Sequence, residues 1–397
     1  MLRPGTFAMT ALLAALTGIG PLTTDMYLPS LPDIARDLAG STAQVQLTIS
    51  TYLIGFGIGQ VIWGPFADRH GRKPVLLAAI AIYIAATVVA ALAPSIEVLI
   101  LARAIQGVGG SGGIVLARAV VRDLYSGTRA AREMSVIGAV MALAPVVAPA
   151  IGGMLETAFT WRSTFYLLTV GGTGLALTVL LMLPETLKIR AAETVSPGSI
   201  LRSFRVLSAS ASYRAHVGLA VLSFAGLFAW ISASSFVLQS RYGLDPFVFG
   251  FAFAVGSVGY MIGTVIAARI VGPLGIDRTM GIGSCMLASG GLFMLLALVT
   301  GYASAVTLVA SISLYLAGMG LVLPQAVAGA LTPFPERAGA ASSLLGFVQQ
   351  SVAAIVGAAV GLTLGADAWP LAIAVALVGC LTLAVWVATR GVRARMA

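Results

Sequence analysis

The chain has 397 residues, of which 59% are hydrophobic and 9% are charged, and its formal net charge is +9. A typical soluble domain is about 25% charged, so the composition excludes a large soluble protein, whose water-facing surface this few polar residues cannot cover. The basic residues lie in short loops between apolar runs, which is typical of membrane orientation and not of nucleic-acid binding. Cys285 and Cys380 both lie in apolar runs, so the sequence predicts neither a disulfide framework nor a metal site.

Taken in chain order, long apolar runs separated by short polar turns make up most of the sequence. A membrane-spanning helix needs about 20 apolar residues, and at this run length only helices satisfy the backbone inside lipid. The sequence therefore predicts an all-α integral membrane protein with twelve transmembrane helices, at 8–28, 46–66, 74–93, 98–120, 134–156, 163–183, 214–238, 248–270, 279–299, 303–327, 339–362 and 368–389.

One long polar interruption separates the first six runs from the last six. It predicts an N-terminal six-helix half at 1–184, a cytoplasmic central loop at 185–213 and a C-terminal six-helix half at 214–397. Apolar residues in this loop repeat at helical spacing, namely Ile200, Leu201, Phe204 and Leu207. An amphipathic helix on the membrane surface and a disordered linker are both compatible with this pattern.

The charges of the loops indicate the orientation of the helices. Only Arg36, Arg162 and Arg241 fall on one side of the membrane, and every other loop cation falls on the opposite side. Because cytoplasmic loops carry an excess of Lys and Arg, both termini are predicted in the cytoplasm, which requires an even number of spans. The preference for alanine and for arginine over lysine hints at a GC-rich bacterial source, so we expect the bacterial cytoplasmic (inner) membrane.

Asp25 is an ionisable residue inside the first run, where charged groups are costly and are functional candidates. A carboxyl group can be charged when it is exposed to water and neutral when it is occluded, which makes a usable proton site. Asp25 is therefore predicted to be a proton-coupling site, which binds and releases a proton. The alternative is that it caps a helix or pairs structurally near the outer surface.

The ten residues from Gly64 to Lys73 form a dense charge cluster between the second and third runs. Such a tight polar turn allows its charges to pair with one another and with neighbouring helix ends. The predicted cytoplasmic gate comprises Gly64, Asp68, Arg69, Gly71 and Arg72. The alternative is a solvated turn that only anchors the chain on the positive side, and both roles can hold together.

Arg103 lies in the fourth run at a depth comparable to that of Asp25. Because arginine is not deprotonated in proteins, it must face a cavity or a carboxylate. We expect Arg103 to stabilise ionised Asp25 and to be released when Asp25 takes a proton or when substrate arrives. A static buried ion pair is the alternative.

Glycine and proline patterns in two runs have a structural and a functional interpretation. The spacing Gly107-x-Gly109-x-x-Gly112 matches a dinucleotide fingerprint, but that motif needs a preceding strand, so close packing of membrane helices explains it better. In the fifth run, a bend could seal the cavity against proton leak, and simple packing is the alternative; the residues concerned are Pro145, Pro149, Gly152 and Gly153.

Four motifs in the first half carry a resemblance to a known family. The turn Gly64-x-x-x-Asp68-Arg69-x-Gly71-Arg72-Lys73 resembles the loop signature of the major facilitator superfamily (MFS). Its drug–proton antiporters have motifs similar to Arg103-x-x-Gln106-Gly107 and to Ala148-Pro149-x-x-Gly152-Gly153, where Ala148 replaces the usual first glycine. The stretch from Leu22 to Pro32 resembles the Bcr/CflA branch of bicyclomycin and chloramphenicol exporters. The second half shows a degenerate echo of the loop signature at 272–278.

This resemblance implies two pseudo-symmetric six-helix halves around a central cavity, with alternating access driven by proton influx. It implies a proton-coupled multidrug efflux antiporter for small hydrophobic, neutral or zwitterionic drugs similar to chloramphenicol or bicyclomycin. An MFS symporter or exporter of a metabolite, such as an amino acid derivative, remains the alternative. The candidate substrate-binding residues are Thr24, Tyr27, Tyr52, Gln106 and Trp230.

The sequence does not predict an enzyme, because it shows no nucleophile paired with a base and no metal cluster. It also has no Walker loop, so the expected energy source is the proton gradient and no cofactor is predicted. The expected partners are a small-molecule drug, protons and the lipid bilayer, with no nucleic acid and no nucleotide. The protein is expected to be a monomer, and a membrane receptor or scaffold fits twelve spans without an appended domain poorly.

Overall fold

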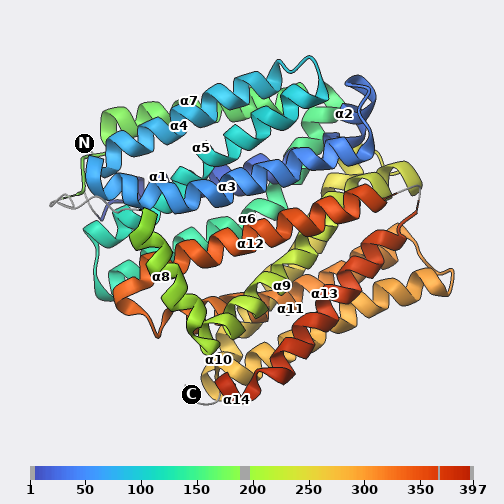
Figure 1. Cartoon of the computed structure of the whole chain (residues 1–397). Helices are drawn as coiled ribbons and strands as arrows, with labels where there is room; N and C mark the ends of the chain where they lie inside the picture. Colours follow the sequence, from blue (N-terminus) through green and yellow to red (C-terminus); the bar gives the residue numbers. More distant parts are fainter. Residues whose placement is uncertain (1–4, 188–196, 365–366, 394–397) are drawn as a thin grey trace. The chain divides into compact units, whose positions relative to one another are not determined.

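The computed structural model describes residues 5–187, 197–364 and 367–393, and no strand occurs among them (Figure 1). The first group of elements is α1 (Phe7–Asp25), η1 (Leu28–Ser30), α2 (Leu31–Asp37), α3 (Thr42–His70), α4 (Arg72–Ala91), α5 (Ile96–Leu124), α6 (Gly127–Ala158) and α7 (Arg162–Met182). The second group is α8 (Pro197–Ala209), α9 (Ala211–Ser235), η2 (Phe236–Arg241), α10 (Pro246–Val299), α11 (Ala305–Leu331), η3 (Pro335–Arg337), α12 (Ala338–Thr363), α13 (Trp369–Ala388) and α14 (Arg390–Arg393).

Each of the twelve predicted runs falls on a helix, which confirms the all-α membrane fold. The predicted start of the fifth run, residue 134, lies within α6, which begins at Gly127. Eleven helices of the described residues are long and apolar enough to cross a membrane, because α10 contains both the eighth and the ninth run. At about 1.5 Å per residue, α10 would be far longer than the roughly 30 Å hydrocarbon core. Its backbone breaks at Gly275, where φ is 78° and ψ is 167°, a conformation that glycine adopts without a steric penalty.

The chain divides into two compact units, Met1–Val195 (unit 1) and Ser196–Ala397 (unit 2). The predicted central loop falls on both sides of this division, and its residues 188–196 lie outside the described residues. The part that is described forms α8, which packs against α9 and α12 of unit 2. Leu207 of α8 is fully buried in the core of that unit, so the helical interpretation of this segment holds for residues 197–209.

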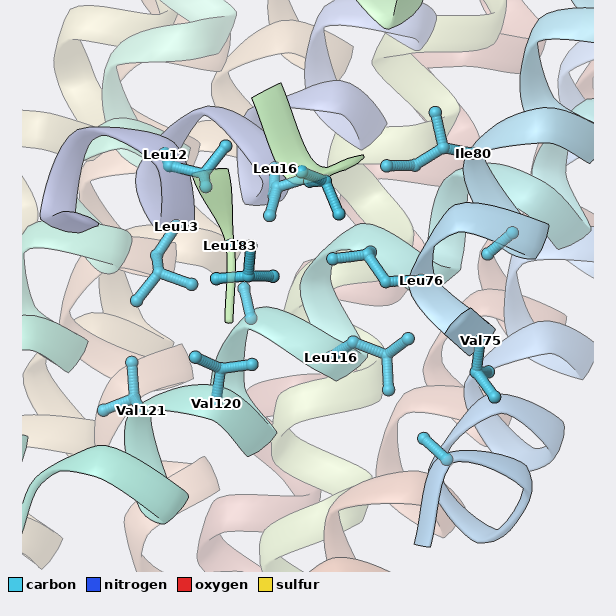
Figure 2. Packing of buried hydrophobic residues seen from close by; sticks show 14 of the residues in the cluster. Leu12, Leu13, Leu16, Val75, Leu76, Ile80, Leu116, Val120, Val121 and Leu183 are labelled. Atoms are coloured by element: carbon cyan, nitrogen blue, oxygen red, sulfur yellow. The ribbon is translucent and has the colours of Figure 1, made fainter. Parts of the chain in front are cut away.

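The core of unit 1 is built from leucine, isoleucine and valine side chains of α1, α4 and α5, with further residues from beyond α7 (Figure 2). Leu16, Leu76 and Leu183 are all fully buried in this cluster. Between helices that lie in lipid, such packing is stabilised by van der Waals contact and not by removal of the side chains from water. This cluster holds α1 and α5, which carry Asp25 and Arg103, in the same packed unit.

Glycines bring α3 and α5 into close contact in unit 1. A side chain at Gly55 would overlap the carbonyl oxygen of Ala104, and one at Gly107 would overlap that of Tyr52. Small residues allow membrane helices to approach in this way. The contact accounts for the glycine spacing in α5 as helix packing.

Candidate functional site

Asp25 is the last residue of α1 and is only 3% exposed. Its Oδ1 accepts a hydrogen bond of 3.0 Å from the Thr24 hydroxyl, which also lies within bonding distance of the Gly20 and Pro21 carbonyl oxygens. One hydroxyl hydrogen cannot serve three acceptors at once, so an ionised Asp25 would be poorly compensated. Aspartate caps the N-terminus of a helix and not its C-terminus, so this position does not favour the capping alternative.

Arg103 of α5 is fully buried and lies between two aromatic rings of unit 1. Its guanidinium carbon is 4.6 Å from the ring centre of Tyr27 and 4.4 Å from that of Tyr52. Its Nη1 donates to the Gln106 Oε1 at 2.7 Å and to the Thr23 carbonyl oxygen at 3.3 Å. Its Nε and Nη2 have no hydrogen-bond partner among the described residues, so two buried donors are left for another group.

The expected ion pair between Arg103 and Asp25 is not formed among the residues that the structure describes. The faces of the two tyrosine rings, which attract cations, take the place of the carboxylate. Unit 1 nevertheless brings Tyr27, Tyr52 and Gln106 against one arginine. We call this group the Arg103 cluster: Tyr27, Tyr52, Arg103 and Gln106.

Hydroxyl groups that the sequence analysis overlooked complete the Arg103 cluster. Tyr27 shares a hydrogen bond of 2.9 Å with Thr48, and the Gln106 amide donates to Thr87 at 2.8 Å. Thr23, whose carbonyl oxygen binds Arg103, shares a hydrogen bond of 2.7 Å with the hydroxyl of Tyr83. These four overlooked residues are Thr23, Thr48, Tyr83 and Thr87. Tyr83 and Thr87 lie one helical turn apart on α4, and this spacing in an apolar run was the available signal.

Trp230, the remaining candidate for substrate binding, belongs to α9 of unit 2. It is fully buried, and its ring stacks on Phe253 with a centroid distance of 6.4 Å. Its Nε1 has no hydrogen-bond partner among the described residues. The structure therefore places this candidate in a different unit from the Arg103 cluster.

Three of the five predicted gate residues, Asp68, Gly71 and Arg72, meet at the start of α4. The Arg72 side chain pairs with Asp68 one turn earlier in the chain and, at 2.8 Å, with Asp123 at the end of α5. Gly71 has φ 101°, which permits the sharp turn between α3 and α4. Of the other two candidates, Arg69 is exposed and Gly64 approaches only Val115 of α5; neither takes part in these pairs.

Glu185, just beyond α7, also binds this turn and was overlooked by the sequence analysis. Its carboxylate accepts backbone N–H groups of Arg72 at 2.9 Å and Lys73 at 3.2 Å, at the positive end of the α4 dipole. Burial acts to raise the pKa of Glu185, but hydrogen bonds from four backbone N–H groups, those of Leu187, Arg72, Lys73 and Thr186, outweigh it. The pKa is therefore lowered from its ordinary value of 4.5.

Replacing Glu185 by glutamine is expected to lower the melting temperature of the protein in a pH-dependent manner. Because the folded-state pKa of Glu185 is lowered, its carboxylate contributes stability above about pH 4.5, and this contribution is lost as the pH falls through the folded-state value. The difference between the native protein and Glu185→Gln should therefore be present at neutral pH and vanish in acid. Thermal unfolding of the purified protein across this range measures it, with the exposed Glu336→Gln as control; a pH-independent difference would contradict the assignment.

Unit 2 has a related arrangement at the echo of the loop signature. Gly275 breaks α10 with a positive φ of 78°, and Asp277 follows it. The Asp277 carboxylate pairs at 2.7 Å with Arg393 of α14, whose Nη2 donates to the carbonyl oxygen of Trp386. Each unit thus ties its glycine turn to the chain segment that follows its last long helix.

The proline and glycine motif of α6 faces the end of α1. Ala148 and Pro149 are buried, and Pro145 is half-buried. A side chain at Gly152 would overlap the carbonyl oxygen of Met26, and Ala148 joins Met26 in a small apolar cluster. Gly153 is also buried, so the motif packs α6 closely against the segment that follows Asp25.

Replacing Gly152 by alanine is expected to destabilise the protein by about 1–3 kcal/mol, the usual cost of forcing an extra methyl group into a packed interior. The new methyl group would push against the backbone of Met26, which cannot move without displacing α1. Gly174→Ala on α7 is the matched control, because nothing lies within 4 Å of its added carbon. Denaturation of both variants measures the difference, and equal stabilities would show that α1 and α6 are not tightly packed here.

Two buried carboxylates of α6 were not singled out from the sequence. Glu133 accepts a hydrogen bond of 2.7 Å from Thr10 of α1, and Glu156 accepts one from Ser30 of η1. Both lie near the ends of α6, where they resemble ordinary loop residues in a hydropathy plot. Their burial makes them alternative candidates to Asp25 for a proton site in unit 1.

Comparison with known proteins identifies close relatives along nearly the whole chain. "Uncharacterized MFS-type transporter YdgK" of Bacillus subtilis (strain 168) is 36% identical over 362 residues and covers 89% of each chain. "Bicyclomycin resistance protein homolog" of Haemophilus influenzae is 32% identical and covers 90% of each chain. "Multidrug resistance protein D" of Escherichia coli (strain K12) is 29% identical and covers 97% of this chain and 96% of the relative. These relatives confirm the prediction of a transporter and not an enzyme.

The fold has a counterpart among solved structures as well. The partially occluded, inward-open xylose transporter XylE from E. coli superposes with a TM-score of 0.75 over 97% of each chain, at 14% identity. At that identity the similarity concerns the fold alone. The family model described as "Major Facilitator Superfamily" matches residues 13–358, the span that includes the loop signature, the Arg103 cluster and the α6 motif. The chain is therefore a multi-pass membrane transporter that belongs to the Major Facilitator Superfamily.

Proposed function

We propose that the protein exports small hydrophobic, neutral or zwitterionic compounds of the chloramphenicol and bicyclomycin type in exchange for protons, by alternating access. The observation that carries this proposal is the buried Asp25, whose carboxyl group has one shared hydroxyl as its hydrogen-bond partner among the described residues. The relatives named for bicyclomycin and multidrug resistance support the class of substrate. Burying a charge with so little compensation is costly, so this carboxyl is suited to take up a proton when it is occluded.

The position of Arg103 supports a role in the same exchange. With Asp25 neutral, the guanidinium rests between Tyr27 and Tyr52 and keeps two unpartnered donors. When Asp25 loses its proton, its carboxylate becomes the strongest available acceptor for such donors. Proton release would then draw Arg103 away from the tyrosines, and binding of either a proton or a substrate would return it.

The fixed charge of Arg103 also bears on substrate choice. A permanent cation with free Nε and Nη2 donors favours compounds that carry acceptor oxygens and disfavours cationic drugs by repulsion. Nitro, carbonyl and hydroxyl oxygens on an otherwise apolar molecule satisfy this requirement. The Arg103 cluster therefore supports neutral or zwitterionic substrates better than cationic ones.

We further propose that the protein lies in the bacterial cytoplasmic membrane with both termini in the cytoplasm and works as a monomer, with the proton gradient as its energy source and no cofactor. The distribution of loop cations supports this orientation. Three arginines are assigned to the side of the membrane that faces away from the cytoplasm. Each of them pairs with an aspartate: Arg36 with Asp33, Arg162 with Asp37 and Arg241 with Asp367.

Proton movement in proteoliposomes tests the exchange directly. The native protein is reconstituted with an imposed pH gradient, and a pH-sensitive dye reports proton flux after chloramphenicol is added. We expect drug-dependent proton movement that is absent from protein-free liposomes. If only amino acid derivatives produce the flux, the protein is a metabolite transporter of the same fold, and if neither class of compound does, proton-coupled export is wrong.

A further inference from the structure

Unit 2 contains a groove whose lining includes none of the residues assigned above to proton coupling or substrate binding. It has a volume of about 710 Å³, within the range of roughly 300–1,000 Å³ that is usual for ligand clefts. The part of α10 from Leu274 onward, together with α11 and α13, forms its walls. The lining residues are Leu274, Arg278, Gly281, Ile282, Cys285, Met286, Ser289, Leu314 and Trp386.

One exposed face of α10 runs along the length of the groove. Arg278, Ile282, Cys285 and Ser289 are all exposed and recur at intervals of three or four residues, so they share one side of the helix. Arg278 and Ser289 are about 16 Å apart along the axis at about 1.5 Å per residue. This distance is close to half of the roughly 30 Å hydrocarbon core, so the groove has the length of a single leaflet.

The floor of the groove is fixed by packing. The indole ring of Trp386 lies so close to Gly281 that a side chain there would overlap it. Its Nε1 donates a hydrogen bond of 3.1 Å to the carbonyl oxygen of Asp277, which holds the ring in place. Leu314 of α11 adds an apolar wall, so the groove is a built apolar surface that stays open without a side chain of unit 2 filling it.

A cation without a partner stands at one end of this apolar groove. Arg278 is exposed, and the structure records no ion pair for it among the described residues. The neighbouring Asp277 is already bound by Arg393 at 2.7 Å. Arg278 follows the turn at Gly275, where the chain leaves one long helix and starts the next, so its charge lies at the membrane surface end of the groove.

We propose that this groove binds an anionic phospholipid, with one acyl chain along α10 and the phosphate on Arg278. The match of length to one leaflet and the apolar lining fit an acyl chain. The uncompensated charge at the surface end fits an anionic head group, as basic pockets between membrane helices do. This inference concerns a surface of unit 2 and does not depend on the proposed proton exchange.

Native mass spectrometry of the full chain tests the assignment of the head group. The delipidated protein is mixed with phosphatidylglycerol or, separately, with phosphatidylethanolamine, and the retained lipid is counted. We expect a preference for phosphatidylglycerol that falls about fivefold in Arg278→Gln, the change expected for one basic residue near an anionic lipid. Arg269→Gln, which removes an exposed cation of the same helix outside the groove, should leave the preference unchanged. Equal losses in the two variants would overturn the proposal.

A second variant tests the acyl-chain site independently of charge. Cys285→Trp places a large ring in the middle of the groove and should abolish retention of phosphatidylglycerol. The melting temperature of this variant checks that it remains folded. Normal lipid retention by a folded Cys285→Trp protein would overturn the site, and so would a native protein that appears as a dimer and retains no lipid.

Discussion

Replacing Asp25 by asparagine is expected to abolish drug-dependent proton movement, leaving only the flux of protein-free liposomes. Asparagine has nearly the same size and still accepts the hydrogen bond from Thr24, so the packing at the end of α1 should be retained. It cannot bind or release a proton, however. The proteoliposome assay measures proton movement and drug uptake together, and the variant is expected to lose the coupling between them.

Two other carboxylate-to-amide variants serve as comparisons for Asp25→Asn. Glu97→Gln removes an exposed carboxylate at the start of α5 and should couple like the native protein. Glu156→Gln removes a buried carboxylate that already has a serine hydroxyl as partner. If Asp25→Asn couples normally and Glu156→Gln does not, the proton site lies at the end of α6 and the assignment of Asp25 is wrong.

Replacing Arg103 by lysine is expected to reduce drug transport by about tenfold or more, which corresponds to losing one buried, charge-assisted hydrogen bond of about 1.5–3 kcal/mol. Lysine keeps the positive charge but has no planar group to lie against both Tyr27 and Tyr52. Its ammonium also has a single nitrogen, so it lacks the separate Nε and Nη2 donors that have no partner among the described residues. Initial rates of drug transport at saturating pH gradient measure the effect.

The comparison with Arg269→Lys, an exposed position on α10, separates this effect from a general intolerance of lysine. Tyr52→Phe is a second useful variant, because it keeps the ring that contacts Arg103 and removes only the hydroxyl bonded to the Gly20 carbonyl oxygen. We expect it to retain more transport than Arg103→Lys, because the ring face that contacts the guanidinium remains. Unchanged transport in Arg103→Lys would rule out the geometric role of the guanidinium.

Hydropathy alone was sufficient to predict the twelve spans, because each run is long enough to cross the membrane and nothing else satisfies its backbone there. The rise per residue predicted Asp25 and Arg103 at comparable depths, and in the structure Arg103 bonds the carbonyl oxygen of Thr23, two residues before Asp25. Their ion pair was wrongly expected, because depth along a helix gives no information about the direction in which a side chain points. That direction is set by packing between helices that are apolar on almost every side, as the tyrosines around Arg103 illustrate.

The residues that bind the predicted gate could not be predicted from the sequence either. The motif from Gly64 to Lys73 is local, so its charges were recognisable, but Asp123 and Glu185 lie far away in the chain. They reach the turn only because α5 and α7 end beside it. A pattern within one segment can identify a charged turn, but it does not show which distant residues bind to that turn.

The pairing of Arg393 with Asp277 has a practical consequence for engineering this protein. Arg393 is 3% exposed and bonds to both Asp277 and the carbonyl oxygen of Trp386. Removing Arg393 by truncation would leave the Asp277 carboxylate without its counter-ion. This carboxylate belongs to the residue whose carbonyl oxygen holds the Trp386 ring at the floor of the groove. Affinity tags and fluorescent fusions should therefore be attached beyond Arg393, even though a hydropathy plot would mark the last long helix as finished several residues earlier.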